Sequence, residues 1–561
     1  MPRRLKPVFE NVFGTAEAMP YPKTVSLSMN LKLRTLKFAA ETAMTRFRLN
    51  DRNPDAIQTW VAALLLAAIA ALALSCSSGG TATPPPPVIN VTPLTAADVQ
   101  SVVQNAAQSV NAPLAIAVAD RVGNILAVFR NPTAPVSATG NFGATVDADE
   151  LAVALARTAA FFSNNQAPLS SRTVRFISGI HFPPGVNGTG PADLYGIENT
   201  NRGCPFNTTF QPGKAINPAR SINGSTTGLG VITGKANTSD GDPNAVNPGG
   251  VPLFKGGGVV GGVGVVSDSP QDAEFAAFSG AFNSGFLPTA AQLPPPGVVI
   301  VGGIALPFVN QTSLPAGASP GSTAGSYVVG PNAGALPPEG DLVGPNAGTG
   351  GLTQADVATI IQQAVDTANR TRAVIRLPSG SRTRMSIAVA DLDGTLLALH
   401  RMPDGTIFSL DVAVAKARNV VWFSSAGIVD LPGMPTGTAI TNRTVSFGSQ
   451  PLFPPGIDGS HLGPFFNNLY LNDVANPCSQ GSQPTNPNQS GIVFFPGSLP
   501  LYKNGVLVGG LGVSGDGVDQ DDYVTFHGAQ GFLPPANIQA DNYSIQGVRM
   551  PYLKFPRNPE N

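Results

Sequence analysis

The stretch GVLVGGLGVSGDGVDQDD, residues 505–522, decides the fold of this chain. Its pattern predicts a buried β-strand over residues 506–513, then a glycine turn, then the start of a helix supplied with acidic residues. The same arrangement occurs earlier as GVVGGVGVVS at residues 258–267, again followed by an acidic helix start. Each stretch follows a Pro-Leu arm, VPLFK at 251–255 and LPLYK at 499–503. The chain therefore contains two rounds of one unit.

The other elements of the unit also occur twice. Each copy opens with a helix that carries a Thr-x-x-Asp capping signal, at Thr95 and again at Thr353. A hairpin and a second helix follow in both copies, with the hairpins over 114–130 and 386–401 and the helices over 150–162 and 410–423. Each copy then carries a long insertion rich in Gly, Asn and Pro, about 187–247 and 458–490.

These repeats predict an α+β fold with two tandem domains, residues 94–310 and 352–557. Each domain is expected to be an antiparallel sheet flanked by helices. A Gly/Pro-rich linker over 311–351 is predicted to join them. Because duplicated units often replace a homodimer, the two domains are expected to pack as a pseudo-dimer.

An export signal is predicted at the start of the chain. Val61–Leu74 is an uninterrupted apolar run, which is shorter than the ~20 residues of a membrane-spanning helix and suits the core of a signal peptide. Leu74-Ser75-Cys76 follows, and this resembles a bacterial lipoprotein signal with Cys76 as the lipidated residue. The alternative is an uncleaved anchor helix.

Residues 1–75 are therefore assigned to the signal region and residues 76–93 to a flexible tether with a proline run. Residues 1–43 do not look like part of a signal peptide, and Met44 is expected to be the true start, with the preceding residues a gene-model extension. The protein is expected in the bacterial cell envelope, lipid-anchored and either periplasmic or at the cell surface.

The composition excludes a nucleic-acid partner. Charged residues make up 12% of the chain, about half the usual share of ~25%. Ten of the 33 Lys and Arg lie in residues 1–75 but only five of the 34 Asp and Glu, so the remainder is net acidic. Phosphate neutralisation needs clustered basic side chains, and the sequence has no such cluster.

No catalytic constellation is recognisable, which favours a binding protein over an enzyme. The four histidines show no metal-ligand spacing, and no Ser-His-Asp order with a nucleophile elbow occurs. The glycines over 509–517 suggest a phosphate cradle, but a glycine strand packed closely against a helix explains them better. Four acids suggest a cation site, and their place at a helix start is the simpler explanation: Asp516, Asp519, Asp521 and Asp522.

The combination of elements resembles the GlcG/HbpS haem-binding (haem-degrading) domain family. In copy two the resemblance is carried by short motifs: Ala388-Val-Ala-Asp391, Asp393-Gly394, Arg401-Met402, Ala415-Lys-Ala-Arg418 and Gly509-Gly-Leu-Gly-Val-Ser-Gly515 with Asp519-Gln-Asp521. Copy one departs from it, with Leu155 where copy two has Lys416, and is expected to be mainly a structural partner. The resemblance implies binding of haem or related tetrapyrroles in some members, and oligomerisation.

The candidate haem site lies on the returning strand of copy two, at His400. An imidazole is a usual axial ligand of haem iron, and copy one has Phe129 at this position. Arg401 and Lys416 are the candidate partners of a propionate. The alternatives are a half-exposed strand histidine for His400 and a surface ion pair or a snorkelling side chain for the two cations. His461 and then His527 are the next candidate ligands.

A disulfide between Cys204 and Cys478 is also predicted. With Cys76 lipidated, these are the remaining thiols, and export exposes them to an oxidising compartment. Both lie in the insertions, at similar distances after a shared Phe-Pro-Pro-Gly block, so equivalent loops would meet across a pseudo-twofold. The alternative is two free thiols.

The sequence therefore predicts an exported, lipid-anchored protein that binds haem or another tetrapyrrole. The alternative is a ligand-free interaction module of the envelope, which uses the same fold and presents its insertions as a contact surface. A hydrolase or oxidoreductase is the weakest of the three hypotheses. A Soret band after haem addition separates the first two.

Overall fold

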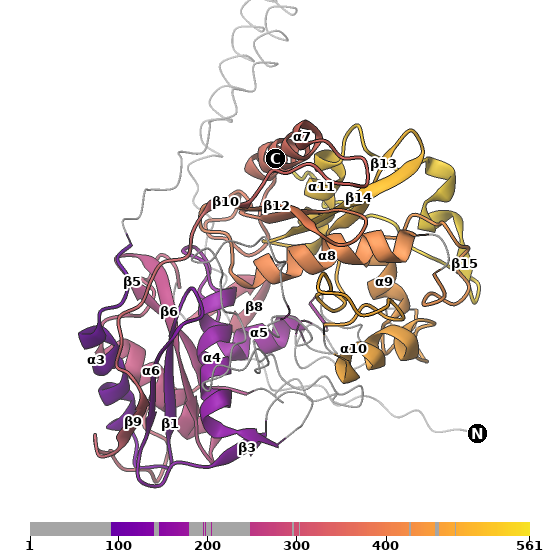
Figure 1. Cartoon of the computed structure of the whole chain (residues 1–561). Coiled ribbons are helices and arrows are strands. Elements are labelled where there is room, and N and C mark those ends of the chain that lie inside the picture. Colours follow the sequence, from indigo (N-terminus) through magenta and orange to yellow (C-terminus); the bar gives the residue numbers. More distant parts are fainter. Residues whose placement is uncertain are drawn as a thin grey trace, which may run out of the picture. The chain divides into compact units, whose positions relative to one another are not determined.

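The computed structural model describes residues 91–139, 145–178, 194–195, 197, 204, 247–293, 297–301, 303–425, 428–454, 459–476 and 478–561 (Figure 1). These residues belong to one unit, 86–561, which is separate from residues 1–85. The signal region, Cys76, His181 and most of the first insertion lie outside the described residues. Within them, no helix is long and apolar enough to cross a membrane.

The first half is a five-stranded antiparallel sheet with helices on its faces. Its sheet runs in the order β5-β6-β1-β2-β9. The strands are β1 (Ala115–Asp120), β2 (Ile125–Arg130), β5 (Gly250–Lys255), β6 (Gly258–Val266) and β9 (Ser326–Val329). The helices that pack on it are α3 (Ala96–Ala107), α4 (Ala148–Phe162) and α6 (Pro270–Asn283).

The second half repeats this architecture. Its sheet runs β10-β12-β11-β14-β13, which is the same order read from the other edge. The strands are β10 (Gly340–Val343), β11 (Ser386–Ala390), β12 (Leu396–Arg401), β13 (Ser498–Lys503) and β14 (Val506–Ser514). The helices are α7 (Gln354–Arg370), α8 (Phe408–Ser424) and α11 (Val518–Gly528). The predicted α+β fold, with two antiparallel sheets flanked by helices, is confirmed.

The segment predicted as a linker does more than connect the halves. It contains β9, which pairs with β2, and β10, which pairs with β12, so it supplies one edge strand to each sheet. These short strands were not predicted, because residues 311–351 are rich in glycine and proline and the partner strands lie far away in the sequence. The smaller elements are β3 (Ser137–Thr139), β4 (Thr145–Asp147), α5 (Ser171–Ser178), β7 (Val298–Val301), β8 (Ile304–Pro307), α9 (Asn442–Gly448), η3 (Phe466–Tyr470), α10 (Leu471–Ala475), η4 (Ala536–Ile538), η5 (Ala540–Asn542), β15 (Ser544–Ile545) and β16 (Val548–Arg549).

The repeated glycines of β6 and β14 let a helix lie directly on each sheet. A Cβ added at Gly512 would approach the carbonyl oxygen of Ala413 in α8 to 2.1 Å. A Cβ added at Gly264 would approach the carbonyl oxygen of Ala152 in α4 to 2.0 Å. Both approaches are far below a van der Waals contact, so only glycine fits there. The interpretation of these glycines as a close-packed strand is confirmed.

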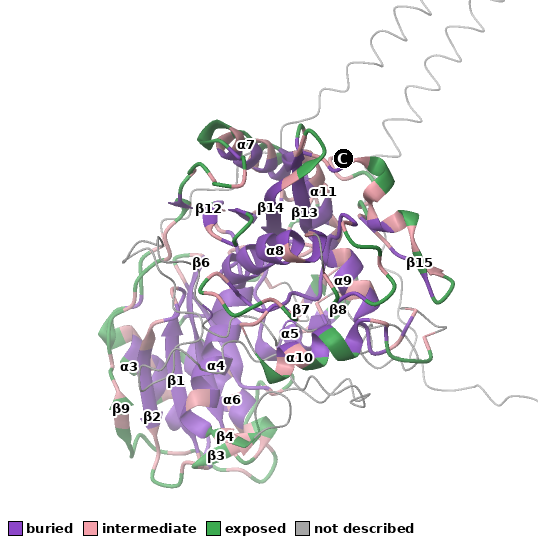
Figure 2. Ribbon diagram, turned by 45° about the vertical axis from the view of Figure 1, so that its right-hand side comes forward, coloured by how far each residue is buried: buried purple, intermediate pink, exposed green. Residues whose placement is uncertain are grey.

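Helices α4 and α8 are buried on all sides, as Figure 2 shows for α8. A helix that is apolar all round needs cover on more than its sheet face. The two helices meet each other: the rings of Phe162 and Phe408 stack at 4.2 Å, and the Ile407 amide donates to the Phe161 carbonyl. One buried cluster accordingly contains side chains from both halves. This packing has the form expected of a pseudo-dimer.

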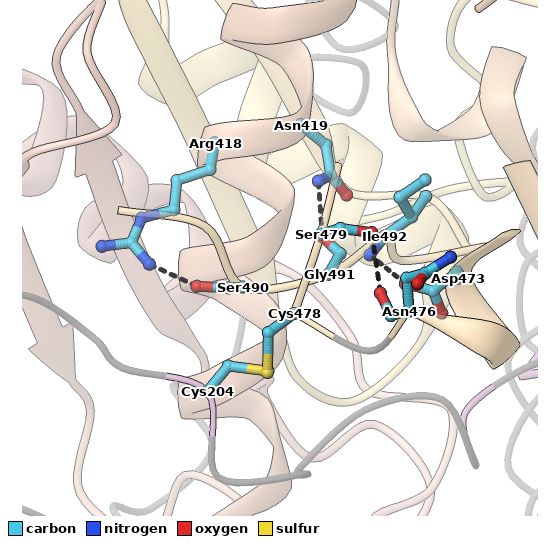
Figure 3. The surroundings of a disulfide bond; sticks show 10 residues. All are labelled: Cys204, Arg418, Asn419, Asp473, Asn476, Cys478, Ser479, Ser490, Gly491 and Ile492. Atoms are coloured by element: carbon cyan, nitrogen blue, oxygen red, sulfur yellow. Dashed lines mark hydrogen bonds between the residues drawn. A yellow bond between two sulfur atoms is a disulfide. The ribbon is translucent and has the colours of Figure 1, made fainter. Parts of the chain in front are cut away.

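A disulfide joins the two insertions (Figure 3). Cys204 and Cys478 are bonded, with their Cα atoms 5.4 Å apart. The chain after Cys478 is anchored on α8, where Arg418 donates to the Ser490 hydroxyl and the Asn419 side chain donates to the Gly491 carbonyl. The bridge therefore ties the first insertion to the core of the second half.

Removal of this bridge is expected to destabilise the protein. It closes a sequence separation of 274 residues, so it restricts the unfolded chain strongly. The pair of substitutions Cys204→Ser and Cys478→Ser should lower the free energy of unfolding by about 2–5 kcal/mol. Urea unfolding with and without reductant measures this, and the double variant should no longer respond to reductant. If reductant does not change the free energy of unfolding of the wild type, the prediction is contradicted.

Candidate functional site

His400 lies near the end of β12 and is held by a carboxylate. Its Nδ1 is 2.7 Å from Oδ1 of Asp341 on the neighbouring edge strand β10, and the imidazole is 19% exposed. The two residues are cross-strand partners in the sheet. A carboxylate at Nδ1 fixes the tautomer with the proton on that nitrogen and leaves Nε2 as a potential metal ligand. Among the described residues, none hydrogen bonds to Nε2.

The first half carries different residues at the equivalent positions. Phe129 of β2 pairs with Ile116, as His400 pairs with Ile387, and its partner on the edge strand is Tyr327. The two rings contact edge to face at 5.2 Å. An aromatic pair therefore replaces the His–Asp pair at this position of the first sheet.

Arg401 points away from this pair and is fully buried. Its guanidinium donates to the carbonyl oxygens of Gly405 and Pro338 and lies 3.5 Å from the Glu339 carboxylate. These bonds close the turn after β12. Neither a surface ion pair nor a snorkelling side chain describes it, and it is not free to meet a ligand propionate.

Lys416 lies on α8 and is also fully buried. Its Nζ donates to Oδ2 of Asp521 at 3.0 Å and to the Val513 carbonyl at 2.8 Å, and it lies 5.0 Å from the centre of the Phe495 ring. Burial lowers the pKa of Lys416, and burial raises the pKa of Asp521 to about 7 despite the nearby lysine. The alternative to a propionate partner, a surface ion pair or a snorkelling side chain, was wrong for Lys416, because the sequence did not reveal its buried partner in α11.

The three residues proposed for haem binding are thus not brought together. No hydrogen bond or ion pair joins His400, Arg401 and Lys416 among the described residues. Of the three, only His400 is partly exposed, and the structure assigns both cations to the interior. Asp341 joins His400 in this site. It was not predicted, because it lies 59 residues away in a segment predicted to be a linker.

The acidic run at the start of α11 is neutralised by cations. Asp516 pairs with Arg376, Asp519 with Arg443 and Lys554, Asp521 with Lys416, and Asp522 with Arg443. Favourable placement at a helix start is therefore only part of the explanation. In the described part of the chain, no group of three or more His, Cys, Asp or Glu is placed to hold a metal ion.

Asp404 connects the two halves. Its carboxylate pairs with Arg121 of the first half at 3.2 Å and with Arg376 of the second half at 2.7 Å, and it accepts from the Asn165 amide. Burial alone would raise the pKa of Asp404, but Arg376 and Arg121 hold it below its usual range. This buried network fixes how α4 and the turn after β12 meet.

The other described histidines contact aromatic rings. His461 stacks on Phe453 at 5.7 Å, and His527 lies against Tyr523 at 4.4 Å and Phe526 at 5.3 Å. Burial lowers the pKa of His527. Within the described ranges, neither is hydrogen bonded to a carboxylate as His400 is.

A cavity of about 340 Å³ lies between the two halves and includes Asp521 in its wall. Its lining is mostly apolar and includes Phe162 from α4, Phe408 from α8 and Phe495. None of the three described histidines is among its lining residues. The cavity and the His400 site are therefore separate features.

The second half matches a known protein family. Residues 352–530 match the family model "Haem degrading protein HbpS-like". The resemblance seen in the sequence is confirmed for this HbpS-like region, which contains His400, Lys416 and Asp521. For the first half, the likeness rests on the repeated sheet order.

A curated protein and several solved structures are similar to the chain. Corrinoid adenosyltransferase PduO of Salmonella typhimurium is 25% identical over 155 residues, which cover 27% of this chain and 33% of PduO. The chain thus matches about a third of the length of that relative.

Three crystal structures each cover 32% of the chain. The PduOC:haem complex is 21% identical, with 94% of its own chain covered and a TM-score of 0.22. Klebsiella pneumoniae protein ORFY is 18% identical, with 86% covered and a TM-score of 0.20. A double mutant of Streptomyces reticuli HbpS is 18% identical, with 85% covered and a TM-score of 0.20.

Proposed function

We propose that this chain is an exported, lipid-anchored protein of the bacterial envelope that binds haem or a related tetrapyrrole through His400. The His400–Asp341 pair carries the proposal. Histidines that ligate metals commonly donate their second ring nitrogen to a carboxylate, which orients the ring and strengthens the ligand. The match of residues 352–530 to the HbpS-like family supports the choice of ligand.

The residues present can supply one ligand to a haem iron. Nε2 of His400 would hold the iron, and Asp341 would keep the ring in the required tautomer and orientation. Bound haem would supply an iron centre whose properties depend on this axial nitrogen. Arg401 and Lys416 have no part in the proposed site, because their charges are engaged in the interior.

The haem site is tested by hemin titration of the mature chain and its variants. His400→Ala is expected to weaken hemin binding by more than tenfold and to shift the Soret band, because the axial nitrogen is lost. Asp341→Asn should weaken it by about 10–100-fold through loss of the orienting carboxylate. His461→Ala is the matched control, and it should bind as the wild type does.

Two outcomes would contradict this assignment. If His400→Ala keeps the wild-type Soret position and affinity, His400 is not the ligand. If the wild type shows no saturable binding, the haem proposal fails and the ligand-free interaction module replaces it.

Export and lipidation are supported by the sequence before the tether. The apolar run Val61–Leu74 ends at Leu74-Ser75-Cys76, and a flexible proline-rich segment follows. Mass spectrometry of the membrane-extracted protein is expected to show Cys76 as a lipid-modified amino terminus. A soluble product that retains residues before Cys76 would refute the anchor, and so would a Cys76→Ala variant that still carries the same lipid.

A further inference from the structure

The wall of the cavity between the halves contains a buried carboxylate oxygen without a partner. Asp521 is 3% exposed, and its Oδ2 accepts from Lys416, but no group of the described protein hydrogen bonds to its Oδ1. Unpaired buried oxygens are rare in folded proteins, since each loses its hydration without replacement. Asp521 is one of the residues that line a cavity of about 340 Å³, so a molecule bound there would lie beside this carboxylate.

The first half shows that the fold does not need the Lys416–Asp521 pair. Gly497 would place a Cβ 2.6 Å from the Asp521 side chain, and the equivalent Gly249 faces the side chain of Ala273 at 3.4 Å. Ala413 of α8 meets Gly512 as Ala152 of α4 meets Gly264, and three residues further along each helix the second half has Lys416 where the first half has Leu155. The same architecture thus forms with Leu and Ala where the second half has Lys and Asp.

A buried ion pair that the fold can replace by apolar residues is weak evidence for a stability role. The pair lies beneath the cavity: Asp521 and Phe495 are both lining residues, and Lys416 contacts each of them. Lys416 supplies the positive charge that keeps the carboxylate in place through Oδ2, while Oδ1 has no hydrogen-bond partner among the described groups.

The other residues that line the cavity indicate which kind of molecule it could hold. The parallel rings of Phe162 and Phe408 form an aromatic wall shared by the two halves. Arg557, which is exposed, marks the side on which the cavity reaches solvent. Ser514, Asp519 and Gln520 add polar groups beside Asp521. A mainly apolar pocket with a few polar groups is the usual form of a small-molecule site.

We propose that this cavity binds a compact aromatic or alicyclic molecule with one N–H or O–H group, which donates to Oδ1 of Asp521. The site is independent of His400 and of the haem proposal. An amine and an alcohol share this donor chemistry, and a hydrocarbon of the same skeleton lacks it.

Three probes test the proposal on the full mature chain: naphthylmethylamine, naphthalenemethanol and methylnaphthalene, followed by naphthalene fluorescence. The wild type is expected to bind at least one donor-bearing probe more than tenfold tighter than methylnaphthalene. Which of the two binds tighter distinguishes an amine site from an alcohol site. In Lys416→Leu/Asp521→Ala, which copies the first half, this preference should fall below about twofold.

A second variant tests the location without touching the ion pair. Ile375→Trp fills the cavity from its lining and should weaken binding of all three probes by more than tenfold. Equal binding of the three probes by the wild type would overturn the proposal, and so would a donor preference that survives in the double variant. Absence of any binding by the wild type would show that the cavity is only a packing void.

Discussion

Asp404→Ala is expected to lower the free energy of unfolding by about 3–5 kcal/mol. The substitution removes the carboxylate shared by Arg121 and Arg376, whose side chains are 5% and 0% exposed. Arg121 would lose its ion-pair partner, and Arg376 would lose one of its two carboxylate partners. Buried positive charge would therefore remain uncompensated. Because these arginines come from different halves, the contact between the halves should weaken most.

Urea unfolding at neutral pH measures this effect, with Asp366→Ala as the control. Asp366 is exposed on α7, and its substitution should change the free energy of unfolding by less than about 0.5 kcal/mol. The folded pKa of Asp404 is lowered, so its stabilisation is present above the ordinary carboxyl pKa of about 3.9 and is lost as the pH falls through the folded pKa. The difference between wild type and variant should therefore shrink in acid. A variant as stable as the wild type at neutral pH would contradict the assignment.

Lys416→Leu is expected to cost a similar amount, about 3–5 kcal/mol, while Lys416→Leu/Asp521→Ala should recover most of it. The single substitution leaves Asp521 buried without its cation. The double substitution reproduces Leu155 and Ala273, which the first half packs at equivalent positions. Burial already raises the pKa of Asp521 to about 7, and loss of Lys416 should raise this pKa further. The variant would keep its carboxyl protonated where the wild type ionises, so its loss of stability relative to the wild type should grow as the pH rises above about 7.

Denaturant unfolding of the wild type and both variants completes this comparison. Recovery in the double variant requires that the two residues act as a pair. If the single and double variants are equally unstable, the apolar arrangement of the first half does not transfer to the second half.

Local patterns made most of the fold predictable. Capping boxes at Thr95 and Thr353 begin α3 and α7 as expected, since the cap and its Asp lie three residues apart. The hairpins, the buried helices and the glycine strands also follow from periodicity and turn residues. The glycines of β14 were correctly attributed to helix packing because no lysine of a phosphate loop accompanies them.

Non-local contacts were not predictable in this way. Lys416 meets Asp521 across 105 residues, and His400 meets Asp341 across 59 residues. The edge strands β9 and β10 form because tertiary partners are available, although the glycines and prolines around them indicate a loop. The burial of Arg401 depends on backbone carbonyls of a turn, which leave no signal in side-chain patterns.

The stoichiometry of hemin binding tests the central claim most directly. Only the second half carries a His–Asp pair at this strand position, because the first half has Phe129 and Tyr327 there. Titration of the mature wild-type chain, followed at the Soret band, is predicted to saturate at one haem per chain. Saturation at two haems per chain, or no saturation at all, would contradict a single site at His400.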